Sequence, residues 1–364
     1  MRLLLITGIF PPDIGGPATY VPLLAEEACH RYQSVSVVTL GNESRHTITK
    51  NYEIISISRA IPKPIRILKT ALILLREARY SDAIFCNGLY IETAIVLRLI
   101  RRRSVAKIVG DPVWEKARNS SRTSLDINDF QSSNWANKDK LVNLIFCKAW
   151  KSFDILSCPS PALVKLIESR IPKKKVIYIP NGVDAPSVIM PKEECTLITV
   201  SRLVSWKNIQ CVIDASSILG YKLMIIGDGP ERLMLEKIVK EKNINATFMG
   251  NLSAQDVRRH LEKVSYFLQV SDYEGLSFSL LEAMACGVVP IVSGNDGNKI
   301  VVQDHVNGVI TKIDGSSIAQ AIQKIQDHPG LYEKISNEAI KTVKEQFNGK
   351  SNRSKMLDLL ESIK

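Results

Sequence analysis

The sequence lacks the cysteine pairs that hold a zinc ion or a disulfide framework. Its seven cysteines include no C-x-x-C pair, and their number is odd. Zinc sites and disulfide scaffolds both need cysteines at paired spacings. We therefore expect buried free thiols in a reducing compartment, and neither a structural zinc site nor a disulfide framework.

Long hydrophobic runs are also absent. No apolar stretch approaches the roughly 20 residues that a membrane-spanning helix needs. The apolar run Leu3–Ile6 is short and soon meets Pro11-Pro12, unlike the long apolar core of a signal peptide. The sequence thus predicts a cytoplasmic protein and leaves open a peripheral location at the inner face of the plasma membrane. It contains no repeat of solenoid period and no low-complexity tract.

The length and composition are typical of a globular protein. Its 364 residues predict about two domains, and 45% apolar and 23% charged residues are typical of soluble proteins. The formal net charge of +11 is notable, although it is too small for a histone-like nucleic-acid binder.

Short apolar runs alternate with segments of helical periodicity in two successive series. This alternation predicts parallel sheets covered on both faces, hence two doubly wound α/β domains. Expected strands are Leu3–Thr7, Val35–Thr39, Glu53–Ile57, Ala83–Cys86, Ala106–Val109, Ile155–Cys158, Val176–Ile179, Thr196–Val200, Lys222–Ile226, Ala246–Met249, Tyr266–Val270 and Val288–Val292. Expected helices include Tyr20–Tyr32, Ile65–Arg79, Asp139–Ser152, Glu231–Lys242 and Leu280–Ala285.

Proline, asparagine and glycine concentrate in Ile179–Pro186, which predicts a linker between the domains. We expect one domain over residues 1–185 and a second over 186–345, with a last helix, 346–364, packing back on the first. The polar stretch Arg118–Lys138 has little periodicity and predicts a long surface loop.

The first motif is Gly15-Gly16, which stands between the first strand and the first helix. Two glycines before a helix let backbone N–H groups approach an anion closely. A turn that needs glycine for its geometry is the alternative. The segment is not G-x-G-x-x-G, which disfavours a dinucleotide site.

The second motif is Ser201–Asn208, directly after a predicted strand. Ligands of open α/β sheets lie beyond the carboxyl ends of strands. Arg202 and Lys207 could therefore converge on a diphosphate and stabilise a leaving group that gains negative charge. A pair of solvated surface charges is the alternative. A third segment, Gly227–Pro230, could face a nucleotide, but a tight turn that caps a helix is favoured.

The fourth motif is Glu274–Gly287, with carboxylates eight residues apart across the start of a helix. The N–H groups of Gly275, Leu276 and Ser277 would be unpaired donors at that helix N-terminus. Sugar hydroxyls need donors and acceptors together, and this segment supplies both. Glu282 as a mere surface residue fits badly, because its neighbours are apolar.

These motifs, with Pro180–Asp184 at the junction, resemble the large retaining glycosyltransferase family GT4. The resemblance rests most on Ser201-Arg202-Leu203, Lys207-Asn208, Gly227–Pro230 and the E-x7-E pair Glu274 and Glu282. It implies the GT-B fold, with two Rossmann-like domains facing each other across a cleft. It implies transfer with retention from a nucleoside-diphosphate sugar, without a metal ion or other cofactor.

The resemblance also implies roles for individual residues. Arg202 and Lys207, with Asn208 beside them and help from Gly15 and Gly16, would hold the donor diphosphate. Glu282 would bind the ribose, and Met249–Leu252 would lie near the base. Glu274 and the following amides would bind hydroxyls of the transferred sugar.

The chain departs from the family in its first half. Many relatives carry a histidine near the reacting carbon, whereas Asn87-Gly88 and Gly110-Asp111 stand at those strand ends here. Asp111 is the candidate for a polar contact to the reacting sugar or the acceptor, or for a base. The alternative is that Asp111 only stabilises the turn before Pro112. Asn87, Trp114 and Glu115 are acceptor-side candidates. The family's Pro-Glu is replaced by Asn298-Lys299.

The positive charge is concentrated in residues 63–107, where ten cations and three acids leave a net +7. Leu68, Ala71, Leu72, Leu75 and Ala78 are expected to share one helix face with cations beside it. Such a surface could bind anionic lipid headgroups. The alternative is a solvated surface on a helix whose other side packs into the core. Nucleic acid is not expected, because interleaved aromatic residues are few.

The sequence therefore predicts a glycosyltransferase that uses a UDP- or GDP-sugar, with a glycan or lipid-linked acceptor of surface polysaccharide or lipopolysaccharide biosynthesis. The alternatives are another sugar-nucleotide enzyme, such as an epimerase or a phosphorylase, and a non-catalytic basic protein that binds membranes or nucleic acid.

Overall fold

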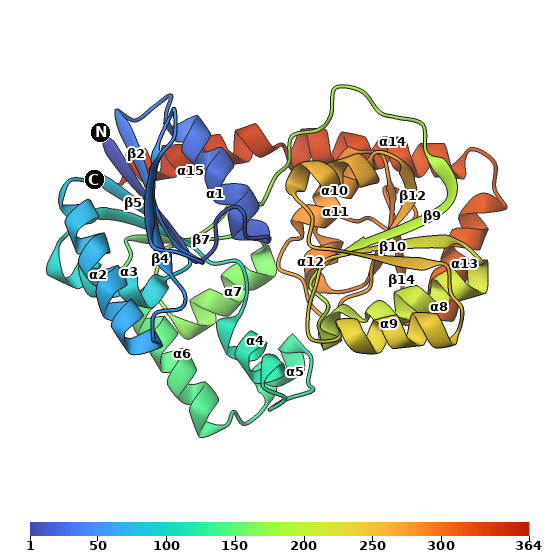
Figure 1. The fold of residues 1–364 in the computed structure, drawn as a ribbon, viewed down its shortest axis with the longest axis horizontal. Helices are drawn as coiled ribbons and strands as arrows, with labels where there is room; N and C mark the ends of the chain where they lie inside the picture. Colours follow the sequence, from blue (N-terminus) through green and yellow to red (C-terminus); the bar gives the residue numbers. More distant parts are fainter. Residues whose placement is uncertain (364) are drawn as a thin grey trace. The chain divides into compact units, whose positions relative to one another are not determined.

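The computed structural model describes residues 1–363, which divide into two α/β units (Figure 1). Unit 1 comprises residues 1–180 and those from 352 onward, and unit 2 comprises Asn181–Ser351. The chain thus enters unit 2 five residues before the predicted boundary. Asn181 explains the difference, because its Nδ2 donates to the Leu276 carbonyl at 2.7 Å inside unit 2. The N–H of Val183 likewise donates to the Phe347 carbonyl.

The sheet of unit 1 has the strand order β3-β4-β2-β1-β5-β6-β7-β8. All neighbours are parallel except the edge hairpin of β3 and β4. The central strands β1, β5, β6 and β7 are almost entirely buried, as parallel strands covered by helices on both faces require. They span β1 (Arg2–Thr7), β2 (Ser34–Gly41), β3 (Arg45–Ile48), β4 (Glu53–Ser58), β5 (Ala83–Asn87), β6 (Arg103–Lys107), β7 (Ile155–Cys158) and β8 (Val176–Tyr178).

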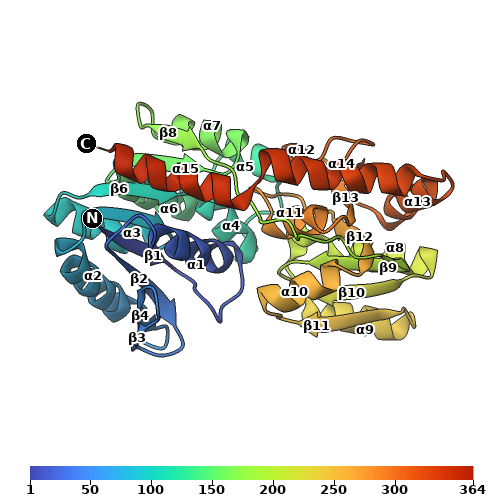
Figure 2. The same ribbon diagram turned by 90° about the horizontal axis from the view of Figure 1, so that it is seen from above.

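Helices cover both faces of this sheet. A core cluster of buried side chains lies under α2, α3, α6 and α7, and α1 lies beside α15 (Figure 2). The helices are α1 (Gly16–Ala28), α2 (Lys63–Arg79), α3 (Tyr90–Leu99), α4 (Pro112–Asn119), α5 (Ile127–Ser132), α6 (Asn137–Trp150), α7 (Pro161–Arg170) and α15 (Gly349–Ser362).

Unit 2 has the sheet order β11-β10-β9-β12-β13-β14, entirely parallel. This is the doubly wound order of a Rossmann fold, whose direction reverses between β9 and β12. Its strands are β9 (Glu193–Val200), β10 (Lys222–Ile226), β11 (Ala246–Gly250), β12 (Val264–Gln269), β13 (Val289–Ser293) and β14 (Val309–Thr311). Its helices are η1 (Ser205–Lys207), α8 (Ile209–Leu219), α9 (Arg232–Glu241), α10 (Ala254–Leu261), α11 (Phe278–Ala285), α12 (Asp296–Lys299), α13 (Gly315–Gln326) and α14 (Leu331–Gln346).

The prediction of two doubly wound α/β domains is confirmed. Three local expectations were wrong. The strand expected over Ala106–Val109 is β6, three residues earlier, because its start is the polar Arg103-Ser104. The expected loop Arg118–Lys138 contains α5, whose N-cap Asp126 accepts from two backbone N–H groups. The edge strand β3 was missed because its residues are mostly exposed and polar.

Helix α15 belongs to unit 1 from Asn352 onward. Met356, Leu357 and Leu360 on it are completely buried. Arg353 Nε donates to Glu27 Oε2 of α1 at 3.1 Å, and the Arg353 side chain is only 8% exposed. The last helix therefore completes the core of unit 1.

Candidate functional site

The loops after β9 and β12 lie side by side at the point where the second sheet reverses direction. Lys207 Nζ donates to Glu274 Oε1 at 2.5 Å, and Ser271 Oγ donates to the same oxygen at 2.7 Å. The Lys207 and Glu274 side chains are 14% and 10% exposed. The two residues expected to contact diphosphate and sugar thus form one ion pair at the carboxyl edge of the sheet.

Asn208 holds these two loops together. It has a left-handed backbone (φ 50°), and its Nδ2 donates to the Val270 carbonyl at 2.9 Å and to Asp272 Oδ1 at 2.7 Å. Both amide hydrogens therefore have partners within the protein. Asn208 was expected beside the donor, and its geometry assigns it to positioning Lys207 and Glu274.

Arg202 is exposed, and its guanidinium lies 5.8 Å from the ring centre of Trp206. The loop after β9 that carries Arg202 packs closely against the turn after β10. A Cβ on Gly227, where φ is +126°, would lie 1.9 Å from the Ser201 carbonyl oxygen. A Cβ on Gly229 would lie 2.3 Å from the Leu203 carbonyl oxygen. The segment Gly227–Pro230 is thus a tight turn that supports the Arg202 loop. The expectation that it caps the next helix was wrong, because the N-cap of α9 is Glu231.

Helix α12 approaches Glu274 from the other side. A Cβ on Gly297 would lie 2.1 Å from the Glu274 carbonyl oxygen, so only glycine allows this approach. The neighbouring Asn298 is completely buried, and its Nδ2 donates to the Ser293 carbonyl at 2.9 Å. Asn298 is therefore part of the scaffold. Sequence reasoning missed Gly297 and Ser271, although both follow strand ends.

The segment after Glu274 leads directly into α11. Ser277 is the N-cap of this helix, and its Oγ accepts from the Leu280 N–H at 3.3 Å and donates to Gln269 Oε1 at 2.8 Å. Leu276 is buried, and Gly275 is half-buried. Glu274 thus lies before the helix N-terminus, where the backbone favours negative charge.

Glu282 lies in the second turn of α11 and is half-buried. Loss of hydration raises the pKa of its carboxyl group to about 7, and the nearby cation Arg258 lowers the pKa only in part. Residues 1–363 provide its carboxylate with no hydrogen-bond partner. An uncompensated carboxylate of this kind is a strong acceptor for ligand hydroxyls.

Met249 and Leu252 are half-buried and pack against the same core cluster as α11. They lie at and just after the end of β11, two strands from β9. Their exposed surface is apolar, which suits the flat face of a base.

In unit 1, Gly15 is the N-cap of α1 with φ 143°, and Gly16 begins the helix. Asn87 ends β5 beside Thr7 of β1, at the reversal point of the first sheet. Asn87 is 2% exposed, and its buried Oδ1 has no hydrogen-bond partner among the described residues. Gly15, Gly16 and Asn87 therefore all follow strands next to this reversal point.

Asp111 has a structural role. Its carboxylate is completely buried and receives both Arg170 Nη1 at 2.8 Å and Arg170 Nη2 at 2.5 Å. Gln131 Nε2 donates to the same carboxylate at 2.9 Å, and the Val113 N–H makes it the N-cap of α4. The geometry supports the turn-aspartate interpretation, because these donors occupy both oxygens and a base needs a free one.

Trp114 is also completely buried, and its Nε1 donates to the Leu125 carbonyl at 3.0 Å. It presents no surface to an acceptor, so the expectation that it lines a pocket was wrong. Glu115 is half-buried in the first turn of α4.

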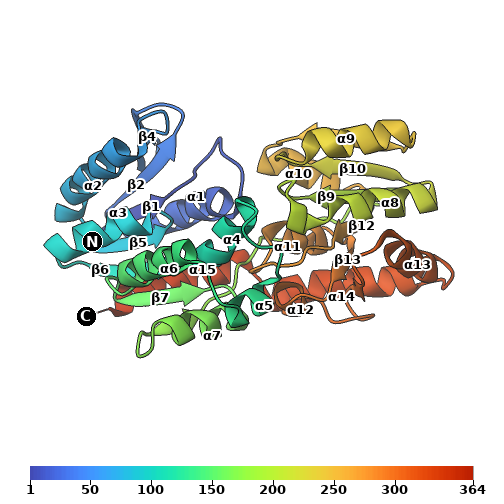
Figure 3. The same ribbon diagram turned by 90° about the horizontal axis from the view of Figure 1, so that it is seen from below.

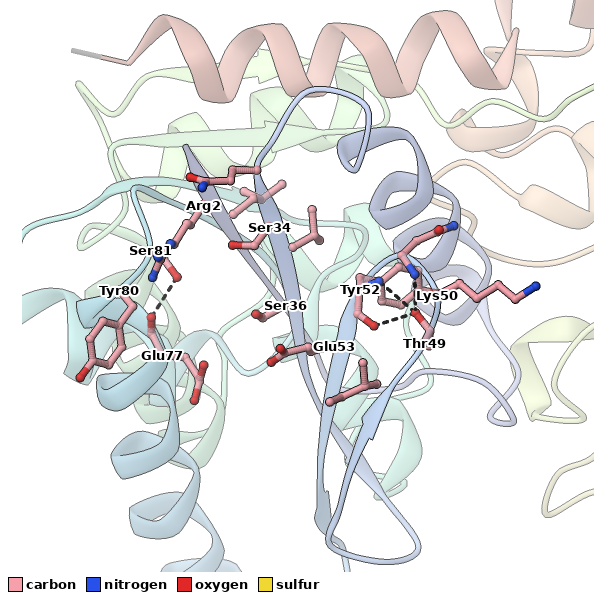
Figure 4. A pocket seen from close by; sticks show the side chains of 15 residues that line it. Arg2, Ser34, Ser36, Thr49, Lys50, Tyr52, Glu53, Glu77, Tyr80 and Ser81 are labelled. Atoms are coloured by element: carbon pink, nitrogen blue, oxygen red, sulfur yellow. Dashed lines mark hydrogen bonds between the residues drawn. The ribbon is translucent and has the colours of Figure 1, made fainter.

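A hollow of about 570 Å³ lies at the opposite, amino-terminal edge of the first sheet (Figure 4). Arg2, Ser34, Glu53 and Ser81 line it, together with other residues that precede or start strands. It contains none of the predicted site residues. Among residues 1–363, no group of histidine, cysteine, aspartate and glutamate side chains could hold a metal ion.

Residues 184–342 match the family model described as Glycosyl transferases group 1. The match lies within the second unit, Asn181–Ser351. The match covers Arg202, Lys207, Glu274 and Glu282, which the resemblance had singled out.

Relatives of this glycosyl transferase family extend the comparison. The lipopolysaccharide core biosynthesis glycosyltransferase LpsE of Rhizobium meliloti is 24% identical over 223 residues, which are 58% of this chain and 66% of LpsE. The chain spans less than half the length of the next two curated relatives it matches.

Two solved structures cover nearly the whole chain. Sucrose-phosphate synthase from Thermosynechococcus elongatus has a TM-score of 0.81 at 19% identity, over 99% of this chain and 98% of its own. Anabaena HepE, crystallised with UDP and glucose, has a TM-score of 0.79 at 16% identity, over 100% of both chains. The chain thus has the GT-B fold that the resemblance implied.

Proposed function

We propose that this protein is a glycosyltransferase that moves a sugar from a nucleoside-diphosphate donor to an acceptor hydroxyl, with retention and without a metal ion. The observation that carries the proposal is the Lys207–Glu274 pair with Ser271 on the same oxygen. A cation and a carboxylate at the reversal point of a doubly wound sheet can bind a phosphate and a sugar hydroxyl respectively.

The proposed chemistry begins with departure of the diphosphate. Lys207 releases part of its contact with Glu274 and neutralises the developing charge, and the exposed Arg202 adds a second cation. Glu274 then accepts hydrogen bonds from hydroxyls of the sugar. The acceptor hydroxyl attacks from the face that the diphosphate leaves, and the phosphate takes its proton.

The nucleoside part of the donor is proposed to bind at Glu282 and the apolar surface of Met249 and Leu252. Ribose hydroxyls would supply the hydrogen bonds that the Glu282 carboxylate lacks. HepE was crystallised with UDP and with UDP-glucose, which supports a uridine donor over a guanosine donor.

The acceptor is proposed to be a sugar of a surface polysaccharide, a lipopolysaccharide core or a lipid-linked glycan. The relative LpsE acts in lipopolysaccharide core biosynthesis, which supports this class. Because such acceptors are membrane-bound, we also propose a peripheral membrane location on the cytoplasmic side.

Thermal unfolding with UDP, GDP, ADP and CMP tests the donor class. A ligand at 100 times its dissociation constant stabilises by about 2.7 kcal/mol. We expect UDP to raise the melting temperature of the wild type in EDTA, and Lys207→Ala to remove that effect. Lys237→Ala is the matched control, because Lys237 is an exposed lysine of α9 whose side chain is 75% exposed.

Product formation from UDP-sugars then tests catalysis. Glu274→Gln should bind UDP yet lose transfer by two orders of magnitude or more. A protein that binds no nucleotide in EDTA, in unit 2 or elsewhere, would contradict the transferase proposal and favour the non-catalytic alternative.

A further inference from the structure

The outer surface of α2, α3 and α6 in unit 1 carries apolar side chains that the fold does not bury. Eight of the 22 large apolar residues exposed in the described chain lie on these three helices. They are Ile65, Leu68 and Leu72 on α2, Ile95 and Leu99 on α3, and Leu141, Leu144 and Ile145 on α6. We call this surface, with the cations listed below, the α2–α3–α6 face.

Helix α2 shows how the apolar residues divide. Ala71, Leu74 and Ala78 pack into the core, whereas Leu68 and Leu72 are 62% and 58% exposed. The five residues expected to share one face, Leu68, Ala71, Leu72, Leu75 and Ala78, therefore differ in burial. The helix has two apolar sides, one buried and one facing outward, and the outward side has no structural explanation in unit 1.

The three helices form a continuous layer. Helix α3 lies between α2 and α6 (Figures 1 and 3). Arg102, just after α3, donates to the Ala78 carbonyl of α2 at 2.9 Å, and Arg98 donates to the Lys148 carbonyl of α6 at 3.3 Å. Single exposed apolar residues are ordinary, but eight of them on three adjoining helices indicate a binding face.

The charges on this layer have one sign. Eight cations are exposed, namely Lys63, Lys69, Arg76, Arg79, Arg98, Lys138, Lys140 and Lys148. The three acidic residues of the same helices are not exposed, because Glu77 and Glu92 are half-buried and Asp139 is buried. Glu77 is moreover paired with Arg76. The partner of this face must therefore be anionic and must accept apolar side chains.

We propose that the α2–α3–α6 face docks on an anionic lipid bilayer, with its apolar side chains inserted at the headgroup boundary. An anionic bilayer offers negative charge above hydrocarbon, which matches cations surrounding an apolar centre. Helices of this kind lie in the interface and do not cross it. In agreement, no helix within residues 1–363 is long and apolar enough to span a membrane.

Vesicle flotation with the full chain tests this proposal. We expect binding to vesicles of phosphatidylcholine with 30% phosphatidylglycerol, and little binding to pure phosphatidylcholine. Lys69→Glu with Arg76→Glu should weaken binding by at least about 25-fold, since each cation near the surface contributes about fivefold. Raising the salt concentration should weaken wild-type binding in the same direction.

The apolar contribution has its own test. Leu68→Ser with Leu72→Ser and Leu144→Ser should weaken vesicle binding about tenfold or more, while the melting temperature and its rise with UDP stay unchanged. The matched control is Leu233→Ser with Met234→Ser on α9 of unit 2, where the two side chains are 81% and 47% exposed. This control should bind vesicles as the wild type does.

Three results would overturn the proposal. The first is wild-type protein that binds no anionic vesicles at low salt. The second is equal loss of binding in the α9 control. The third is a wild-type protein that is a dimer without vesicles and becomes a monomer when Leu68, Leu72 and Leu144 are changed. That result would make this face a contact between two copies of the chain. None of these readouts requires sugar transfer, so they can be distinguished from failure of the proposed enzyme activity.

Discussion

At the residue scale, two titratable groups, one half-buried and one completely buried, lack hydrogen-bond partners for their charged atoms among the described residues. Glu282 is half-buried beside apolar residues of α11, and Lys107 is completely buried at the end of β6. Lys107 Nζ lies 4.0 Å from the ring centre of Tyr20 and has no hydrogen-bond partner among the described residues. Both groups reduce stability in their charged forms, and their pKa shifts give the pH ranges.

Glu282→Gln should stabilise the ligand-free protein above pH 7. Burial raises the Glu282 pKa from 4.5 to about 7, so the folded state holds the proton that the unfolded state has lost. Stability contributed by this group is therefore present below pH 4.5 and is lost as the pH rises to 7. We expect a gain on the order of 1–3 kcal/mol at pH 8 and little change at pH 4.5 in urea unfolding.

The same variant should bind UDP more weakly, because a neutral amide replaces the acceptor for the ribose hydroxyls. A Glu282→Gln protein that gains no stability at pH 8 yet binds UDP normally would contradict both roles. Glu241→Gln is the control, since Glu241 is a 61% exposed residue at the end of α9.

Lys107→Met should stabilise unit 1 near neutral pH. Burial lowers the Lys107 pKa from 10.5 to about 7, so the unfolded state binds the proton more tightly. The cost is complete below pH 7 and disappears as the pH rises towards 10.5. We expect Lys107→Met to raise the unfolding free energy by on the order of 2 kcal/mol at pH 7, after the loss of the contact with Tyr20. Calorimetry at pH 7 and pH 9.5 should show the difference shrinking at the higher pH.

At the element scale, the turn after β10 positions the loop after β9. Gly227 and Gly229 leave no room for a Cβ against Ser201 and Leu203, and the Leu203 N–H donates to the Asp228 carbonyl at 3.0 Å. The two loops are thus one packed unit, and Arg202 and Lys207 depend on a turn that touches no ligand in the proposal.

Gly227→Ala should therefore damage the site as well as the fold. Its φ of +126° and the 1.9 Å approach force the Ser201 backbone to move, so we expect a loss above about 2 kcal/mol and weaker UDP binding. Gly220→Ala is the matched control, because φ is +70° there and nothing lies within 4 Å of the added Cβ. That control should lose about 1 kcal/mol and bind UDP normally. Equal effects on UDP binding would contradict the positioning role.

At the scale of the whole molecule, each unit has its own core and its own sheet. Residues from the chain terminus complete the core of unit 1, since α15 buries Met356, Leu357 and Leu360 there. UDP is proposed to bind unit 2, so the two units can be followed separately in unfolding.

Leu360→Ala should destabilise unit 1 by about 2–5 kcal/mol, because it leaves a cavity beneath α15. Calorimetry with and without UDP should show a lowered transition that UDP does not shift and a second transition that UDP raises. Leu359→Ala is the control on the same helix, since Leu359 is 9% exposed and should cost less. A UDP-responsive transition that falls with Leu360→Ala would contradict the assignment of α15 to unit 1.

The sequence by itself determined the two α/β series, most strand positions and the resemblance that the match over residues 184–342 supports. Apolar runs such as Ala83–Cys86 and Lys222–Ile226 are local signals, and so are glycines and carboxylates at fixed spacing after a strand. The position of Glu274 before a helix and of Glu282 within it could likewise be predicted from local spacing.

Only the tertiary structure decided which polar side chains are available to a ligand. Asp111 and Glu274 both follow strands, yet Arg170 and Gln131 occupy the first, whereas Lys207 and Ser271 meet the second at the sheet reversal. It also decided that Leu68 and Leu72 face outward while Ala71 is buried. For Asp111 and Glu274, the deciding partners Gln131, Arg170 and Lys207 lie 20 to 67 residues away along the chain, so local spacing could not predict them.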